Sequence, residues 1–201
     1  MTKPTRILLF LIAGLYLLDQ ITKGLIVHYF EQPSFLISSA GMTRNFDKIS
    51  IIDGYFNIVR VHNTGVAFGI GNGTVWSSYV FLAIPIIAIF ALIWAYRKGF
   101  FSTTMMKIGW AFLLAGVCGN ITDRLIQGFF LNVSHMLSFW ECVMAGYVVD
   151  FIDIKIPWIN YTWPSFNIAD SCICISAVIF LICSFTSVSD QDQQQQESLK
   201  K

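Results

Sequence analysis

Charged residues are scarce in this chain. Lys, Arg, Asp and Glu together make up 12% of its 201 residues, whereas 55% are apolar. A soluble domain of this length needs more charge to cover its surface, so the apolar excess is expected to face lipid. The formal net charge is +1, which offers neither a basic patch for nucleic acid nor an acidic field. The composition therefore indicates a membrane protein of one domain with no nucleic-acid partner.

Disulfide frameworks and the motifs of common hydrolases are also lacking. The chain has five cysteines, and four of them lie within or beside apolar runs, so we interpret them as buried free thiols. It contains no G-x-S-x-G motif, no H-E-x-x-H motif and no Gly-rich loop ahead of a helix, and it has three histidines. These absences argue against the usual serine and zinc hydrolases and against phosphate-binding loops.

Apolar runs predict four helices at about 7–29, 75–96, 105–125 and 167–187. The second carries no charge over about 22 residues, which is enough to cross a hydrocarbon core of ~30 Å. The first follows Lys3 and Arg6 as a secretory signal would, but Asp19-Gln20-Ile21 occupies the place of the small residues at a cleavage site. We interpret that run as a retained helix, and the sequence predicts an all-α integral membrane protein with four transmembrane helices.

Two long connections, about 30–74 and 126–166, join these helices. Phe56–His62 alternates as a strand does and follows the turn signal Asp53-Gly54, so we expect a small extracytoplasmic β element. The aromatic residues of the second connection suit the membrane–water interface. In this interpretation residues 1–186 form one membrane-embedded domain, and the glutamine-rich stretch 187–201 is a disordered cytoplasmic tail.

The distribution of Lys and Arg predicts that both termini are cytoplasmic. With four spans the termini share a side, and basic residues in short segments near span ends set the orientation, whereas long loops count little. The basic residues on the side of the termini are Lys3, Arg6, Arg97, Lys98, Lys107, Lys200 and Lys201.

The uncommon polar residues of the spans lie at one depth. A helix rises ~1.5 Å per residue, so Asp19, 13 residues after Arg6, lies ~20 Å from the cytoplasmic side. Asn120, 13 residues after Lys107, lies at a similar depth. Asp170 falls in the first turn of the last helix, which runs the opposite way. Ionisable groups at such a depth are costly unless paired or hydrated, and they usually mark a function.

Structural roles are open for several of these residues. Asp19 can pair with Lys23 one turn later on the same helix face. Asp123 and Arg124 can form an ion pair that closes the end of the third helix. Neither pairing would by itself require a catalytic site.

Asn167 suits the N-cap of the last helix, with Asp170 at its N3 position, and capping is compatible with catalysis. Two carboxylates held close share one proton, so one can activate a water while the other polarises a carbonyl and protonates the leaving amine. The same residues could equally line a proton or ion path. An aspartyl peptidase and a small proton- or ion-conducting membrane protein both remain open. They differ at Asp150, because a conduction path has no need of a carboxylate in a loop just before the last helix.

Five short blocks give the chain a specific resemblance. In order they are Asp19-Gln20-Ile21-Thr22-Lys23, Asn63-Thr64-Gly65-Val66-Ala67-Phe68, Gly119-Asn120-Ile121-Thr122-Asp123-Arg124, Val148-Val149-Asp150-Phe151 and Phe166-Asn167-Ile168-Ala169-Asp170-Ser171. Together they closely resemble the lipoprotein signal peptidases, or signal peptidase II, of bacteria. The resemblance implies an intramembrane aspartyl endopeptidase without metal or organic cofactor. Such an enzyme removes signal peptides from diacylglyceryl-modified prolipoproteins, cutting before the lipidated cysteine.

The resemblance also implies roles for individual residues. The family's catalytic pair falls on Asp150 and Asp170. Positions that bind substrate or support the pair fall on Asp19, Lys23, Asn63, Gly65, Asn120, Asp123, Arg124, Asn167 and Ala169. A multi-pass protein of the bacterial cytoplasmic (inner) membrane follows, with its active site near the outer face. Its partners would be the prolipoprotein substrate and membrane lipid, and we expect a monomer.

One segment departs from the family pattern. A short connection separates Arg124 from the block of Asp150 in relatives, whereas residues 126–147 here contain an insertion. We expect either an enlarged flap over the site or a surface helix lying on the membrane. Trimming a flap would alter substrate affinity more than turnover.

Overall fold

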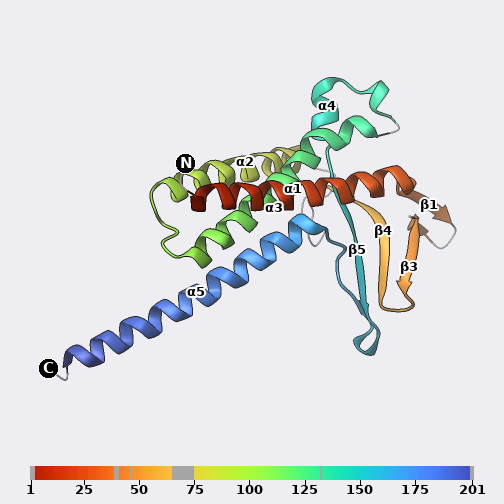
Figure 1. Cartoon of the computed structure of the whole chain (residues 1–201). Helices are drawn as coiled ribbons and strands as arrows, with labels where there is room; N and C mark the ends of the chain where they lie inside the picture. Colours follow the sequence, from red (N-terminus) through yellow and green to blue (C-terminus); the bar gives the residue numbers. More distant parts are fainter. Residues whose placement is uncertain (1–2, 39–40, 46, 65–74, 132, 200–201) are drawn as a thin grey trace.

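Four long helices dominate the computed structural model, which describes residues 3–199 except 39–40, 46, 65–74 and 132 (Figure 1). They are α1 (Lys3–Tyr29), α2 (Val75–Arg97), α3 (Thr104–Ile126) and α5 (Ile168–Leu199). Each contains a stretch that is long and apolar enough to cross a membrane. The prediction of four helices of membrane-spanning length is confirmed.

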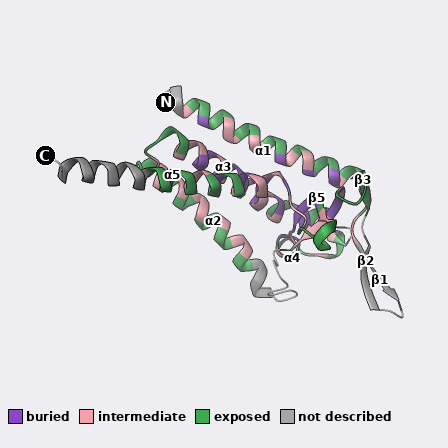
Figure 2. Cartoon of the chain, turned by 90° about the horizontal axis from the view of Figure 1, so that it is seen from below, coloured by how far each residue is buried: buried purple, intermediate pink, exposed green. Residues whose placement is uncertain are grey.

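The helix α3 lies at the centre of the helical part. It packs against α1, α2 and α5, and a larger share of its span is buried than of any other. Trp110 of α3 packs with Leu8 of α1, and its indole N–H donates to the carbonyl of Leu92 on α2 at 2.9 Å. Ile87 and Phe90 of α2 are exposed, and Figure 2 shows such exposed positions along the outer sides of the helices. An apolar outer surface of this kind suits lipid.

The helix α5 is longer than the sequence predicted. It continues from its apolar span to Leu199, through residues for which we expected a disordered tail. Gln, Glu and Leu are good helix formers, and a helix that the span has already nucleated extends at little cost. The tail therefore differs from our expectation up to residue 199.

A β-structure covers one end of the helical part. The strands β3 (Lys48–Ile52), β4 (Phe56–Asn63), β5 (Val148–Ile156) and β6 (Tyr161–Thr162) form an antiparallel sheet in that order, and β1 (Ser34–Ser38) pairs with β2 (Gly41–Asn45). The strand predicted at 56–62 is confirmed as β4. The expectation of a loop over 126–166 is wrong at β5, because Val148–Phe151 are all buried and a fully buried strand shows no alternation.

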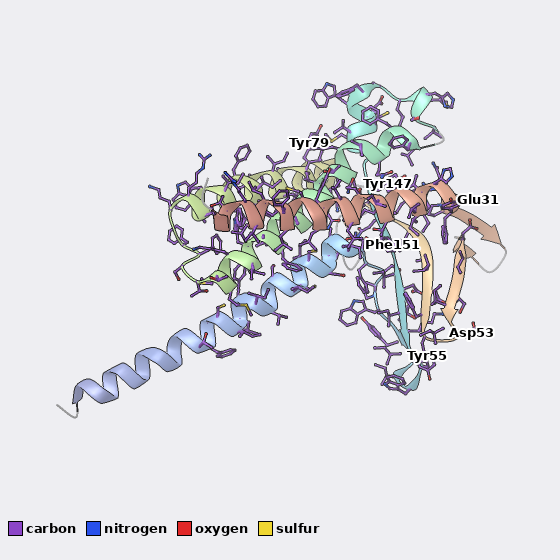
Figure 3. All side chains as sticks on the ribbon, in the orientation of Figure 1. Glu31, Asp53, Tyr55, Tyr79, Tyr147 and Phe151 are labelled. Atoms are coloured by element: carbon purple, nitrogen blue, oxygen red, sulfur yellow. The ribbon has the colours of Figure 1, made fainter. Side chains whose placement is uncertain are left out.

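The sheet joins the helices through a small apolar core. Ile26 and Phe30 at the end of α1 pack against Tyr147, Val149 and Phe151 at the start of β5. Figure 3 labels Tyr147 and Phe151 where β5 passes the ends of α1 and α5. This core places the first residues of β5 directly beside the ends of two spans.

The insertion between α3 and β5 contains short helices. They are η2 (Gln127–Phe130), η3 (Ser134–Met136) and α4 (Phe139–Met144), and one more turn, η4 (Pro157–Ile159), links β5 to β6. In Figure 1 the insertion projects sideways from the end of α3.

Candidate active site

Asp150 lies on β5, where the sheet meets the helices, and it is 2% exposed. The side-chain amide of Asn63, the last residue of β4, donates to Oδ2 of Asp150 at 2.9 Å. The side-chain amide of Asn167 donates to Oδ1 at 2.7 Å. Both oxygens of this buried carboxyl therefore accept a hydrogen bond from a neutral amide.

Asp170 approaches the same place from the first turn of α5. The backbone N–H of Asp170 donates to the side-chain oxygen of Asn167 at 2.9 Å. In return, the backbone N–H of Asn167 donates to Oδ2 of Asp170 at 3.2 Å. This reciprocal pair has the form of a capping box and confirms the prediction that Asn167 caps the helix. Asp170 is partly exposed at the surface of the protein.

Two asparagines join the aspartates. Asn167 contacts both, through its side-chain amide to Asp150 and through its backbone to Asp170. Asn120 on α3 donates to Oδ1 of Asp170 at 2.8 Å, and its own side-chain oxygen accepts from Asn167 at 3.2 Å. Residues from α3, β5 and α5 thus converge on one polar centre.

A buried cluster of charges lies beside this centre. Lys23 of α1 is 1% exposed, and its Nζ lies 2.8 Å from Oδ2 of Asp19 and 3.1 Å from Oδ2 of Asp123. The predicted ion pair between Asp19 and Lys23 is present. Asp123 was expected to pair with the adjacent Arg124, but in the structure its ion pair is with Lys23. Lys23 Nζ also donates to the side-chain oxygen of Asn120 at 3.0 Å. The charge cluster is therefore linked to Asp170 through one asparagine.

Close packing holds α1, α3 and α5 together at the cluster. The backbone N–H of Ala169 donates to Oδ1 of Asp19 at 2.8 Å. A Cβ on Gly119 would lie 2.5 Å from Oδ2 of Asp19, so a larger residue there would displace the Asp19 carboxylate or its neighbours. The Gln20 side chain donates to the carbonyl of Gly119 at 3.2 Å and to Oδ1 of Asp123 at 3.3 Å. Gln20 and Gly119 belong to the sequence blocks, but their spacing alone carried no signal of these contacts.

Arg124 lies on the side of the site that faces α2. It interacts electrostatically with Asp150 and Asp170, and its guanidinium carbon lies 5.2 Å from the ring centroid of Phe81. Gly65, another residue that the sequence singled out, lies outside the described residues.

Arg60 is a buried charge that the sequence analysis missed. It is 3% exposed, and its guanidinium donates to the carbonyls of Phe30 at 2.7 Å and Val27 at 3.2 Å, at the C-terminus of α1. It also donates to the hydroxyl of Tyr147 at 3.4 Å. Arg60 therefore satisfies the last carbonyls of α1 and ties the sheet to it. An arginine inside the predicted strand 56–62 was the one available signal.

The environment of Asp150 favours its neutral form. Burial raises the pKa of the Asp150 carboxyl to about 7, and the negative charge of Asp170 adds to that rise. The hydrogen bonds from Asn63 and Asn167 act in the opposite direction and only partly offset it. The centre can therefore hold and release a proton near neutral pH.

Within the described residues, no group of three or more His, Cys, Asp or Glu side chains could hold a metal ion.

Comparison with known proteins identifies the family. The family model described as signal peptidase (SPase) II matches residues 11–186. A lipoprotein signal peptidase of Syntrophus aciditrophicus is 34% identical over 186 residues, covering 90% of this chain and 93% of that protein. One from Alteromonas mediterranea is 33% identical over 141 residues, covering 70% of this chain and 66% of that protein.

Solved structures agree with the sequence match. A structure described as a bacterial membrane enzyme superposes with a TM-score of 0.67 at 27% identity, covering 91% of this chain and 90% of that one. A second structure with the same description gives a TM-score of 0.63 at 28% identity, covering 88% and 90% of the two chains. This chain, with its four helices of membrane-spanning length, therefore belongs to the signal peptidase II family of membrane proteases.

Proposed function

We propose that this protein removes signal peptides from diacylglyceryl-modified prolipoproteins as an aspartyl endopeptidase, cutting before the lipidated cysteine. Asp150 and Asp170 are its catalytic pair. The observation that carries the proposal is that Asn167 contacts both aspartates, one through its side chain and the other through its backbone. Two carboxyls gathered in this way share a proton, as an aspartic peptidase requires to activate a water and protonate the leaving amine.

The two carboxyls divide the chemistry between them. Asp150, whose pKa burial raises to about 7, enters with the proton and donates a hydrogen bond to the scissile carbonyl oxygen. Asp170, which is partly exposed, takes a proton from a water whose oxygen adds to the carbonyl carbon. When the C–N bond of the tetrahedral intermediate breaks, a carboxyl proton passes to the nitrogen of the cysteine, which leaves as the new amino terminus.

The neighbouring polar residues position the pair and the substrate. Asn63 and Asn167 orient the carboxyl of Asp150, and Asn120 orients that of Asp170. The remaining proposed supporting residues are Asp19, Lys23, Gly65, Asp123, Arg124 and Ala169. Of these, Lys23 acts on Asp170 through Asn120, with Asp19 and Asp123 balancing its charge.

The position of the site suits a substrate confined to a membrane. A signal helix and two acyl chains both lie in the bilayer, so the peptide bond between them must be cut close to its surface. The aspartates lie where the spans meet the sheet. With both termini in the cytoplasm, as the positive-inside rule favours, this end is the outer face of the bacterial inner membrane. Lipid is then the second partner, and we propose a monomer as the working unit.

Cleavage of a diacylglyceryl-modified prolipoprotein by the purified protein in lipid tests the proposal. We expect Asp150→Asn and Asp170→Asn to lower turnover by roughly 10²–10⁴-fold, since each removes a group that transfers protons. Asp153→Asn is the matched control, because Asp153 is buried on the same strand but accepts its hydrogen bond from Asn57 at 2.6 Å. That control should retain activity.

A folded wild-type protein that leaves the substrate intact would contradict the proposal. Proton flux through liposomes that contain the protein then tests the conducting alternative. Flux that Asp170→Asn abolishes would favour conduction. Cleavage that survives in both aspartate variants would instead remove Asp150 and Asp170 from the catalytic role.

A further inference from the structure

The insertion between α3 and β5 is packed firmly against the rest of the protein. Cys142 and Val143 of α4 are buried. Gly128 lies against the carbonyl of Cys142, and Gly146 lies against the carbonyl of Arg124, each too close for a Cβ to fit. The first contact packs η2 against α4 within the insertion, and the second holds the end of the insertion against α3.

Most of the exposed side chains of the insertion are apolar, although His135, Ser138 and Glu141 are exposed as well. Six of its side chains are 38% to 75% exposed. They form what we call the aromatic face, which consists of Phe129, Phe130, Val133, Met136, Phe139 and Trp140. The ring centroid of Phe139 lies 5.4 Å from that of Phe129 and 5.3 Å from that of Trp140, so the middle of the face is continuous. Soluble surfaces rarely expose such a cluster without a partner.

The aromatic face continues the lipid-facing surface of α3. Leu125 and Ile126, in the last turn of that helix, are each 41% exposed. The apolar stretch of this span extends beyond α3 to Phe130, and so overlaps the start of the insertion. The 23 residues of α3 rise ~34 Å, slightly more than the ~30 Å of a hydrocarbon core. The insertion therefore begins at the level where a span leaves the core.

The insertion also runs in the direction expected of an element that lies at the membrane surface. Figure 1 shows that α4 lies to the side of the helices and does not continue along α3. An element that turns sideways at the end of a span runs along the membrane surface. Its aromatic side chains then lie at the height where Trp residues are enriched in membrane proteins.

The charge of the insertion also points to lipid. Residues 127–146 contain no Lys, Arg or Asp, and Glu141 is their one carboxylate. Glu141 accepts a hydrogen bond from the backbone N–H of Ser138 at 2.8 Å at the start of α4. A surface with so little charge provides no complementary pattern for a charged protein partner, whereas the membrane interface accepts aromatic rings readily.

We propose that the aromatic face inserts into the interfacial layer of the bilayer, with phospholipid as its partner. The insertion is then a lateral anchor beside the end of α3. This inference goes beyond the peptidase activity and does not depend on it, because it concerns how the protein is seated in lipid.

Depth-dependent fluorescence quenching tests the anchor with the full chain in phospholipid nanodiscs. The difference in emission between wild type and Trp140→Phe reports Trp140 alone. We expect lipids brominated near the headgroup end of their acyl chains to weaken that emission by about twofold or more, and aqueous acrylamide to have little effect. Trp94→Phe supplies a positive control, since Trp94 is 56% exposed on the apolar span of α2. Met136→Trp in the Trp140→Phe background gives a second probe on the same face.

The outcomes separate clearly. Quenching by brominated lipid at both probes supports the anchor. Quenching by acrylamide without an effect of brominated lipid shows that the face meets water and overturns it. Protection from both quenchers, with Trp94 responding to lipid, shows a covering protein and overturns it as well. None of these readings depends on whether a prolipoprotein is cleaved.

Discussion

The side-chain nitrogen of Asn167 lies 2.7 Å from Oδ1 of Asp150. The same residue caps α5 through its side-chain oxygen, which accepts from the backbone N–H of Asp170 at 2.9 Å. One asparagine therefore performs two separable tasks, because an acceptor is enough for the cap, while only an amide can donate to Asp150.

Asn167→Asp should separate these tasks. Aspartate caps a helix as well as asparagine does, so at pH 5 or below, where the new carboxyl can hold a proton, we expect the melting temperature in detergent to change less than in Asn167→Ala. At pH 8 it should fall, because the position is 0% exposed and an ionised carboxylate there has no cation beside it among the described residues. The new carboxylate cannot donate to Asp150 when ionised and adds a negative charge beside it, which raises the pKa of Asp150 further. Turnover should fall by about 10²-fold or more, with the remaining activity shifted to higher pH. Asn167→Ala loses cap and donor together, and a melting temperature at pH 5 equal to that of Asn167→Asp would contradict the capping role.

The stability of the protein should depend on pH through Asp150. Its pKa rises from 3.8 in the unfolded chain to about 7 in the folded protein, so the folded state binds more protons between these values. The contribution of Asp150 to stability is therefore fully present below about pH 4 and is lost as pH rises through about 7. Asp150→Asn removes this dependence. We expect the variant to be more stable than wild type at pH 8, by at most about 4 kcal/mol.

Denaturant unfolding in detergent at pH 5 and pH 8 measures this effect. The difference in unfolding free energy between Asp150→Asn and wild type should grow in favour of the variant as pH rises. A difference that stays constant between the two pH values would show that Asp150 is not buried with a raised pKa.

Removing the charge of Lys23 should destabilise the protein strongly. Lys23 contacts Asp19 at 2.8 Å and Asp123 at 3.1 Å, and all three side chains are 1% exposed or less. Lys23→Met leaves two buried carboxylates without a cation, which typically costs 3–5 kcal/mol. In the double variant Lys23→Met with Asp123→Asn one of those charges is gone, so the loss should be smaller than the sum of the single losses. Additive losses in a double-mutant cycle would show that the two residues do not interact.

Gly119→Ala should disturb the site although it adds a single methyl group. Its Cβ would lie 2.5 Å from Oδ2 of Asp19 and 3.1 Å from the Cβ of Ala169, so the Asp19 carboxylate has to move away from Lys23 or the helices have to shift. We expect a loss of about 1–3 kcal/mol and reduced cleavage. Gly24→Ala is the matched control, because nothing lies within 4 Å of a Cβ at Gly24. Alanine there should be neutral or stabilise α1 by up to about 1 kcal/mol.

Shortening the insertion tests its part in substrate binding. Replacing residues 129–144 with a short flexible linker removes α4 and the aromatic face. If the insertion helps to hold the lipid-borne substrate, KM should rise while kcat changes little, because Asp150 and Asp170 keep their amide partners. Unchanged KM and kcat would discard the idea of a flap over the site.

The membrane architecture and the candidate residues follow from the amino-acid sequence without a structure. Spans of about 20 apolar residues reflect only the thickness of the bilayer and the rise of a helix, which are local properties. The strand β4 and the Asn167 cap were predictable for the same reason, since alternation and capping depend on neighbours in the chain. The aspartates within the spans could be singled out as candidates, because charges inside a membrane are costly wherever they occur.

The contacts between these residues, in contrast, depend on how the helices and the sheet pack together. Asp150 was expected in a loop, but Val148–Phe151 are buried and form the start of β5. Because all four residues are buried, they lack the alternation of apolar and polar residues from which a strand can be predicted. The partner of Asp123 is Lys23, 100 positions away in sequence, and not its neighbour Arg124. Pairings between distant segments depend on how α1, α3 and α5 pack, and that geometry is set by the close approach of Gly119 to Asp19 and Ala169. Local sequence patterns carry no information about such contacts, because they arise only when the separate helices have come together.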